Sequence, residues 1–191
     1  MSLKRFSKYF TRITNTLIII SIVSFLFRGA IYRACVKYEN NGARKSYIVD
    51  DKQFSNYLDL YLPEEKFSDI HVISDLSQEL ASNILSYSSD ISETNPNKLY
   101  HTGKATCVGY ATLTAAIANY LLNKGDNMGW EAIPVKGKLY LFGINIHQYT
   151  GNNKMFKDHD FVIFRNKESN TEIYVDPTVN DYIWVNKVSK R

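Results

Sequence analysis

Cys107, His159 and Asp176 have the residue types and the chain order needed for nucleophilic chemistry on an amide bond. Cys107 opens a long apolar helical pattern, and a helix N-terminus favours a negative thiolate over a neutral thiol. A thiolate attacks a carbonyl carbon, an imidazole accepts and returns a proton, and a carboxylate holds the imidazole in one orientation. The three residues are therefore a candidate catalytic triad.

A hairpin formed by the last two predicted strands would bring the histidine and the carboxylate together. The strands, residues 159–165 and 171–176, are separated by a short polar segment typical of a hairpin loop. A four-residue loop would place His159 opposite Asp176, and a five-residue loop would place Asp160 there. In both registers only docking against the cysteine-bearing helix is needed to complete a triad.

Helical patterns occupy the middle of the chain, and strand patterns follow them. The segment 86–97 is rich in Ser, Asn and Pro and indicates a loop before the third helix. The predicted helices run from Asp50 or Asp51 to Pro63, from Ser74 or Asp75 to Leu85, and from Cys107 to about Lys124.

Strands are predicted after these helices, because β-branched and aromatic residues are concentrated there. Helices followed by strands favour an α+β domain, in which an antiparallel sheet packs on the Cys107 helix. The predicted strands are residues 130–136, 139–149, 159–165 and 171–176.

Residues 1–37 differ from the rest of the chain in charge and hydropathy. They hold seven Lys or Arg and no acid, so 16 of the 23 bases remain against all 19 acids in residues 38–191. An uncharged apolar run at 17–27 follows the first basic residues, as in a signal-like segment. We expect an uncleaved anchor from about Ile13 to Tyr32, hence a single-pass membrane protein with an extracytoplasmic body. A buried N-terminal helix of a soluble protein is the alternative.

The composition and motifs limit the remaining classes. With 191 residues and 45% apolar residues, the chain predicts a folded body: a linker and short helical lead-in at 38–73, then a catalytic domain at 74–191. The body lacks the basic excess that nucleic-acid binding requires, so no nucleic-acid partner is expected. Two distant cysteines do not indicate a disulfide scaffold, and no cofactor is predicted.

Other interpretations of the same residues remain open. Cys107 could be a small buried hydrophobe, and His159 with Asp176 an ordinary surface pair. A metal site could involve Asp158 and Asp160, with His101 or His147, but no HxH or HExxH spacing supports one. We therefore predict no metal.

The motifs around these residues resemble the transglutaminase-like family, the branch of papain-like cysteine enzymes with the order Cys, His, Asp. The resemblance covers roughly residues 75–180. Asp160 stands where the family often has a small residue, and Phe161 where it often has Trp. The matching motifs are Gly103-x-x-x-Cys107-x-x-x-Ala111, Val135-x-Gly137, His159-Asp160-Phe161-Val162 and Tyr174-Val175-Asp176-Pro177-Thr178.

This resemblance implies a transglutaminase-core, papain-like fold and acyl chemistry on protein or peptide amides. Water as acceptor would give hydrolysis, and a lysine amine would give an isopeptide bond. The backbone N–H of Cys107 would be one oxyanion donor, with Tyr100 or His101 as candidates by position for a second. The expected function is a membrane-anchored cysteine peptidase, amidase or transglutaminase-like acyltransferase. The alternative is a catalytically degenerate binding or scaffolding module of the same fold.

Overall fold

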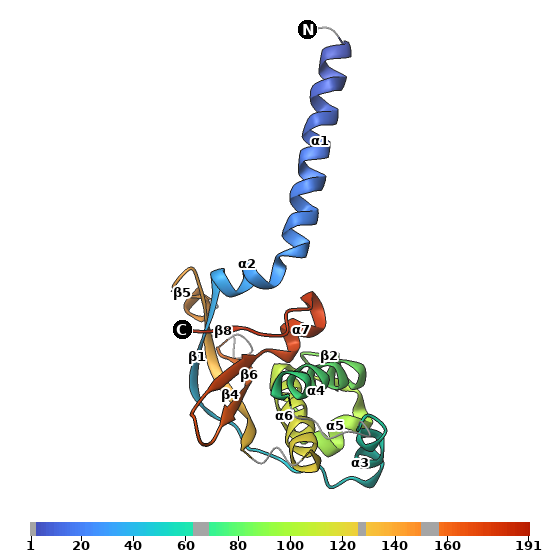
Figure 1. Cartoon of the computed structure of the whole chain (residues 1–191), viewed down its shortest axis with the longest axis vertical. Coiled ribbons are helices and arrows are strands. Elements are labelled where there is room, and N and C mark those ends of the chain that lie inside the picture. Colours follow the sequence, from blue (N-terminus) through green and yellow to red (C-terminus); the bar gives the residue numbers. More distant parts are fainter. Residues whose placement is uncertain (1–2, 63–68, 126–128, 150–156) are drawn as a thin grey trace.

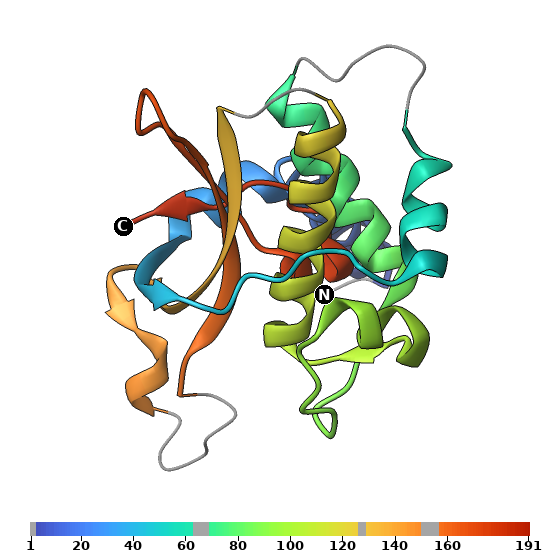
Figure 2. The same ribbon diagram turned by 90° about the horizontal axis from the view of Figure 1, so that it is seen from below.

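Helix α6 (Cys107–Lys124) is the element on which both layers of the fold pack. The computed structural model describes residues 3–62, 69–125, 129–149 and 157–191. Buried alanines such as Ala111, Ala115 and Ala118 allow other elements to approach α6 closely. Helix α4 (Ile70–Ile84) and the strands β4 and β6 all contact it. Figure 2 shows the resulting arrangement, with the sheet on one side and the helices on the other.

The main sheet confirms the predicted α+β class. Its strand order is β7-β6-β4-β1-β8, with β5 paired to β4. All its pairs are antiparallel except β1 with β8, so the expectation of a purely antiparallel sheet was wrong at one edge. The reason is the helix α7 (Pro177–Ile183), after which the chain returns to the far edge of the sheet. The strands are β1 (Val36–Ala43), β4 (Trp130–Leu141), β5 (Ile144–Asn145), β6 (His159–Asn166), β7 (Glu172–Val175) and β8 (Ser189–Lys190).

Strand β1 corrects the predicted linker. Residues 36–43 lie between β4 and β8, and Tyr38 is completely buried. The expected boundary at residue 38 therefore cuts through the folded body. The reason is tertiary, because long-range pairing with β4 stabilises a polar segment that has little strand pattern of its own.

Some of the helices have the predicted bounds and caps, and others do not. Helix α3 (Lys52–Asp59) is capped by Asp51 as expected; Pro63 lies outside the described residues. Helix α4 begins earlier than predicted, because Asp69 caps it and Ser74 lies buried inside it. Part of the predicted 86–97 loop is ordered as β2 (Ser86–Tyr87), which pairs in parallel with β3 (Lys104–Ala105). Helix α5 (Pro96–Thr102) then precedes β3.

The predicted strand 139–149 is divided. Its first residues continue β4, which is a single strand from 130 to 141, and its last form the 3-10 helix η1 (Ile146–Tyr149). Phe142 and Gly143 form the turn before β5, with φ angles of 49° and 83°. This turn ends the long strand and reverses the chain.

The N-terminal segment forms two helices and not the single continuous anchor that the sequence predicted. Helices α1 (Leu3–Leu26) and α2 (Arg28–Cys35) meet at a bend of 74°. By length and composition no single described helix could cross a membrane, although the two together could. Figure 1 shows α1 extending away from the body. The apolar side chains of α1 from Ile13 onward are exposed, with Leu17 at 59% and Ile19 at 61% exposure, so the alternative of a buried helix was wrong.

Candidate active site

Cys107 lies at the first turn of α6, as the sequence predicts. Thr106 precedes it in an extended conformation and makes no side-chain capping bond. The first amide groups of a helix have no partner within the helix, so they remain available as donors beside the thiol. Gly103 ends α5 just before this point in a left-handed conformation, with φ of 65°, where glycine carries no steric cost.

His159 is the first residue of β6 and is paired with Gly137 of β4. A side chain at Gly137 would collide with its surroundings, because a Cβ there would lie 2.3 Å from the Glu39 carbonyl oxygen and 2.4 Å from Phe161 Cε1. The glycine therefore permits the close approach of β1 and β6 beside the histidine. The His159 side chain is 17% exposed.

Asp176 is completely buried at the junction of β7 and α7. Its Oδ1 accepts from the backbone N–H groups of Thr178 at 3.0 Å and Val179 at 3.1 Å. Its Oδ2 lies 2.6 Å from His159 Nε2 and accepts the Tyr38 hydroxyl at 2.7 Å. The carboxylate is thus the cap of a helix and the partner of an imidazole at once.

Both predicted hairpin registers were wrong, although the contact they were meant to produce exists. Val162 pairs with Val175, so Asp176 follows one position beyond the last pair, level with Phe161. The reason is that Asn166 belongs to β6, which makes the four-residue loop 167–170. His159, two residues before Phe161, is then a diagonal neighbour on the same face.

The ring nitrogens of His159 have separate surroundings. Nε2 contacts Asp176, which leaves Nδ1 as the atom that can exchange a proton with Cys107. Burial by itself would lower the pKa of His159, but the charge and hydrogen bond of Asp176, then those of Cys107, raise it well above 6.5. Burial would raise the pKa of Asp176, but the His159 charge and the hydrogen bonds lower it from 3.8. The arrangement favours the imidazolium form of His159 beside the Asp176 carboxylate.

Tyr38 is a site residue that sequence reasoning missed. Its hydroxyl bonds Asp176, and its ring meets the His159 ring edge to face at 6.2 Å. The Tyr32 hydroxyl lies 2.8 Å from the Tyr38 oxygen and donates to it, since Tyr38 donates to the carboxylate. Burial, followed by the charge of Asp176, raises the pKa of Tyr38 well above 10.0, so the hydroxyl stays a donor. The only sequence signal was the apolar alternation of Val36 and Tyr38.

Arg44 balances the negative charge of Asp160, the residue that follows His159. Asp160 is completely buried, and both its oxygens accept from the Arg44 guanidinium, with Nη2 at 3.0 Å. Arg44 also lies 3.7 Å from Asp158. Its hydrogen bond to Asp160 raises the pKa of Arg44, and the negative charges of its neighbours, Cys107 among them, add to this. A fixed positive charge therefore lies near Cys107.

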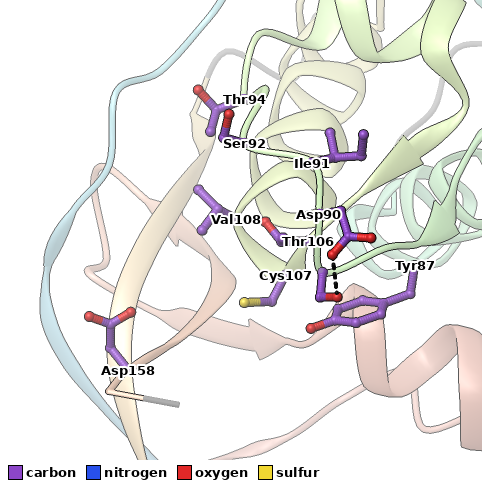
Figure 3. Close-up of a pocket in the computed structure, with 10 residues that line it drawn as sticks. Tyr87, Asp90, Ile91, Ser92, Thr94, Thr106, Cys107, Val108 and Asp158 are labelled. Atoms are coloured by element: carbon purple, nitrogen blue, oxygen red, sulfur yellow. Dashed lines mark hydrogen bonds between the residues drawn. The ribbon is translucent and has the colours of Figure 1, made fainter. Parts of the chain in front are cut away.

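Cys107 opens onto a pocket of about 380 Å³. Six residues between positions 87 and 94 form one wall, residues 106–108 the floor, and Asp158 the opposite side. Figure 3 shows Cys107 between Tyr87 and Asp158. Pairing of Tyr87 with Ala105 fixes the tyrosine beside the start of α6. Burial and then the charge of Cys107 raise the pKa of Tyr87, so its hydroxyl is a neutral donor at the pocket.

The sequence also offers candidates for a second oxyanion donor and for a metal site. Tyr100 stacks on Phe54 at 4.9 Å, and His101 pairs with Asp51 at 3.0 Å, so both contact α3 and its cap. Tyr87, which lines the pocket together with Cys107, is a candidate donor in their place. Among the described residues, no group of three or more His, Cys, Asp or Glu could hold a metal ion.

Comparison with known proteins gives no further identification. No family model matches the chain, and no curated protein matches it.

Proposed function

We propose that this protein is a membrane-anchored cysteine enzyme that transfers or hydrolyses acyl groups of protein or peptide amides, in the manner of the transglutaminase-like family. One observation carries the proposal. The His159–Asp176 pair, at 2.6 Å, lies beside a free cysteine at the start of a helix, and that cysteine shares a hydrogen bond with His159 and lines a pocket. The α+β layering, with α6 packed on the sheet, is compatible with a transglutaminase-core, papain-like fold.

The residues would divide the reaction as follows. The Cys107 thiolate attacks the amide carbon, and the carbonyl electrons move to an oxyanion facing the amide groups at the start of α6. His159 donates its proton to the leaving amine as the C–N bond breaks, which leaves a thioester. Water or a lysine amine then attacks the thioester, His159 takes its proton, and the thiolate departs. Asp176 stabilises the imidazolium throughout.

The membrane part of the proposal rests on α1 and α2. Bare apolar side chains along α1 are unfavourable in water, where each fully exposed side chain forgoes roughly 1.5–3 kcal/mol of burial. Insertion of α1 into a bilayer removes that cost. The signal-like order of basic residues and apolar run favours an extracytoplasmic body.

Selective alkylation tests the catalytic assignment. The chain has two cysteines, and both are free thiols, so the Cys35→Ser variant leaves Cys107 as the single target. We expect rapid labelling of that variant by iodoacetamide near pH 6, where an ordinary thiol is almost entirely protonated. Adding His159→Ala should slow labelling by about 10²-fold, since the thiolate loses its cation. Equal, slow labelling with and without His159 would contradict the proposal.

The second candidate function is a catalytically degenerate binding or scaffolding module. The observation that favours it is the pocket lining, which includes Cys107 but not His159. A substrate bound there could meet the thiol without meeting the base. Under this alternative, a peptide library would show binding to wild-type protein without hydrolysis or amine incorporation, and Cys107→Ala would bind equally well.

A further inference from the structure

Two exposed apolar tips lie at the end of the body from which α1 emerges. One is the β4–β5 turn, where Phe142 is 75% and Ile144 52% exposed. The other is the end of α7, where Tyr182 is 58% and Trp184 60% exposed. Figure 1 shows these tips on either side of α2, which lies across the same end of the body.

Helix α2 is tied to both tips by direct contacts. The Phe142 backbone N–H donates to the carbonyl of Cys35, the last residue of α2, at 2.8 Å. Arg28 Nε donates to the Ile183 carbonyl at 2.9 Å, and its guanidinium lies 5.7 Å from the Trp184 ring centre. The turn, α2 and the end of α7 therefore form one surface, which we call the docking face.

The backbone at both tips is one that bulky residues avoid. Phe142 has φ of 49° and Trp184 has φ of 53°, in the left-handed region that favours glycine. Trp184 occupies the cap position after α7, where glycine is the usual residue. The Trp184 ring meets the Phe25 ring of α1 edge to face at 6.0 Å, but 60% of Trp184 and 75% of Phe142 stay exposed, so burial in the body does not offset this cost. Two strained, exposed aromatic residues on one face indicate that their side chains serve a contact outside the fold.

We propose that the docking face rests on the surface of the same bilayer that α1 enters, with the Phe142 and Trp184 rings inserted at the interface. The inference rests on the membrane anchorage in the proposed function, and it is independent of the chemistry of Cys107. Three features select lipid as the occupant. The face continues into the bare apolar surface of α1, its tips carry the aromatic residues typical of membrane interfaces, and residues 1–37 have seven bases and no acid.

This placement defines which substrates can reach the site. His159 pairs with Gly137, which lies four residues from Leu141 on β4, or roughly 13 Å along the strand from the docking face. Trp130 lies at the other end of β4, roughly 36 Å from Leu141. The site is thus in the membrane-proximal half of the body. Protein segments held near the bilayer surface are the substrates that we infer.

The two tryptophans provide the experiment, because Trp130 and Trp184 are the only ones in the chain. Full-length Trp130→Phe protein, with Trp184 as sole emitter, is incorporated into vesicles of phosphatidylcholine and phosphatidylglycerol. Acyl chains brominated near the headgroup should quench most of its emission. The matched Trp184→Phe protein, with Trp130 as sole emitter, should keep nearly all of its emission in the same vesicles.

Flotation of the vesicles separates the possible failures. Protein that floats but shows equal, unquenched Trp184 emission in brominated and ordinary lipid overturns the docking inference alone. Protein that does not float overturns the docking and the membrane anchorage together. Trp184 emission could instead be protected from both lipid bromine and aqueous iodide, with the protection increasing with protein concentration. That result overturns the docking inference and indicates a contact between two copies of the chain.

A glycine substitution distinguishes docking from folding. Phe142→Gly, in the Trp130→Phe background, relieves the left-handed strain, so the melting temperature should not fall. Bromine quenching of Trp184 should nevertheless decrease, since one of the two inserted rings is lost. Leu60→Gly removes an equally exposed apolar side chain elsewhere on the body and should leave quenching unchanged. Quenching unaffected by Phe142→Gly would contradict an inserted turn.

Discussion

Two buried carboxylates at one end of the sheet, Asp176 and Asp160, have partners of opposite character. Both are completely buried, and each accepts charge-assisted hydrogen bonds. Asp160 faces the guanidinium of Arg44, which keeps its proton at any physiological pH. Asp176 faces the imidazole of His159, which can release its proton. The first pair supplies a fixed structural charge, and only the second can take part in proton transfer.

The difference assigns separate roles to residues that look equivalent in the sequence. Removing the partner of Asp160 should mainly reduce stability. Removing the partner of Asp176 should mainly change the reactivity of Cys107.

The largest effect is expected for Asp176→Asn in the Cys35→Ser background. Loss of the charge removes the main influence that keeps His159 protonated, so iodoacetamide labelling of Cys107 near pH 6 should slow by about 10²-fold or more. The control is Asp160→Asn, which should slow labelling far less. Equal slowing by both substitutions would show that the two carboxylates act on Cys107 in the same way.

Arg44→Met should have the largest effect on stability. It leaves Asp160 buried without its cation, and losing one partner of a buried pair costs about 3 kcal/mol, less here because Arg44 is one-third exposed. The double variant Arg44→Met/Asp160→Leu should recover most of this loss. Urea unfolding in detergent measures both, and strictly additive losses would show that the two residues do not form a coupled pair.

The pH dependence of stability should separate the pairs in sign and range. A pKa of His159 raised above 6.5 means that its stabilisation is fully present below about pH 6.5 and is lost as pH rises through the folded-state value. The lowered pKa of Asp176 means that its stabilisation is present above about pH 3.8 and is lost at lower pH.

The measurement is the difference in free energy of unfolding between wild type and His159→Gln. It should be level from about pH 4 to 6.5 and then shrink by at most about 1.4 kcal/mol per pH unit. The corresponding difference for Arg44→Gln should stay constant from about pH 6 to 9, because that pair keeps its charges. A parallel decline in both would contradict the assigned partners.

Tyr38→Phe should have the smallest effect. It removes one hydrogen bond to Asp176 and leaves the His159 contact, so we expect about 1 kcal/mol lower stability and about 5-fold slower labelling of Cys107. Tyr32→Phe is the matched control, since its hydroxyl contacts only the Tyr38 oxygen in this chain of bonds. Equal effects of both substitutions would show that Tyr38 fills space and does not position Asp176.

The sequence predicted the elements whose signals are local. The start of α6 at Cys107 and its end before Gly125 follow from the apolar period, and the 159–176 hairpin follows from two β-rich runs around a polar turn. The register was missed by a residue or two, because loop length alone does not decide whether Asn166 belongs to the strand. Helix α7 was missed because Asp176, assigned only to the site, is also its cap.

The residue types and their order along the chain determined the candidate triad, since a helix N-terminus and a hairpin are set by nearby residues. Only the tertiary structure decided what surrounds it. Tyr38 and Arg44 contact the site across 138 and 116 positions of sequence. These contacts depend on β1 pairing with β4, and no local pattern encodes a pairing between segments so far apart. Because of the same pairing, β1 supports the site, although its own sequence is typical of a linker.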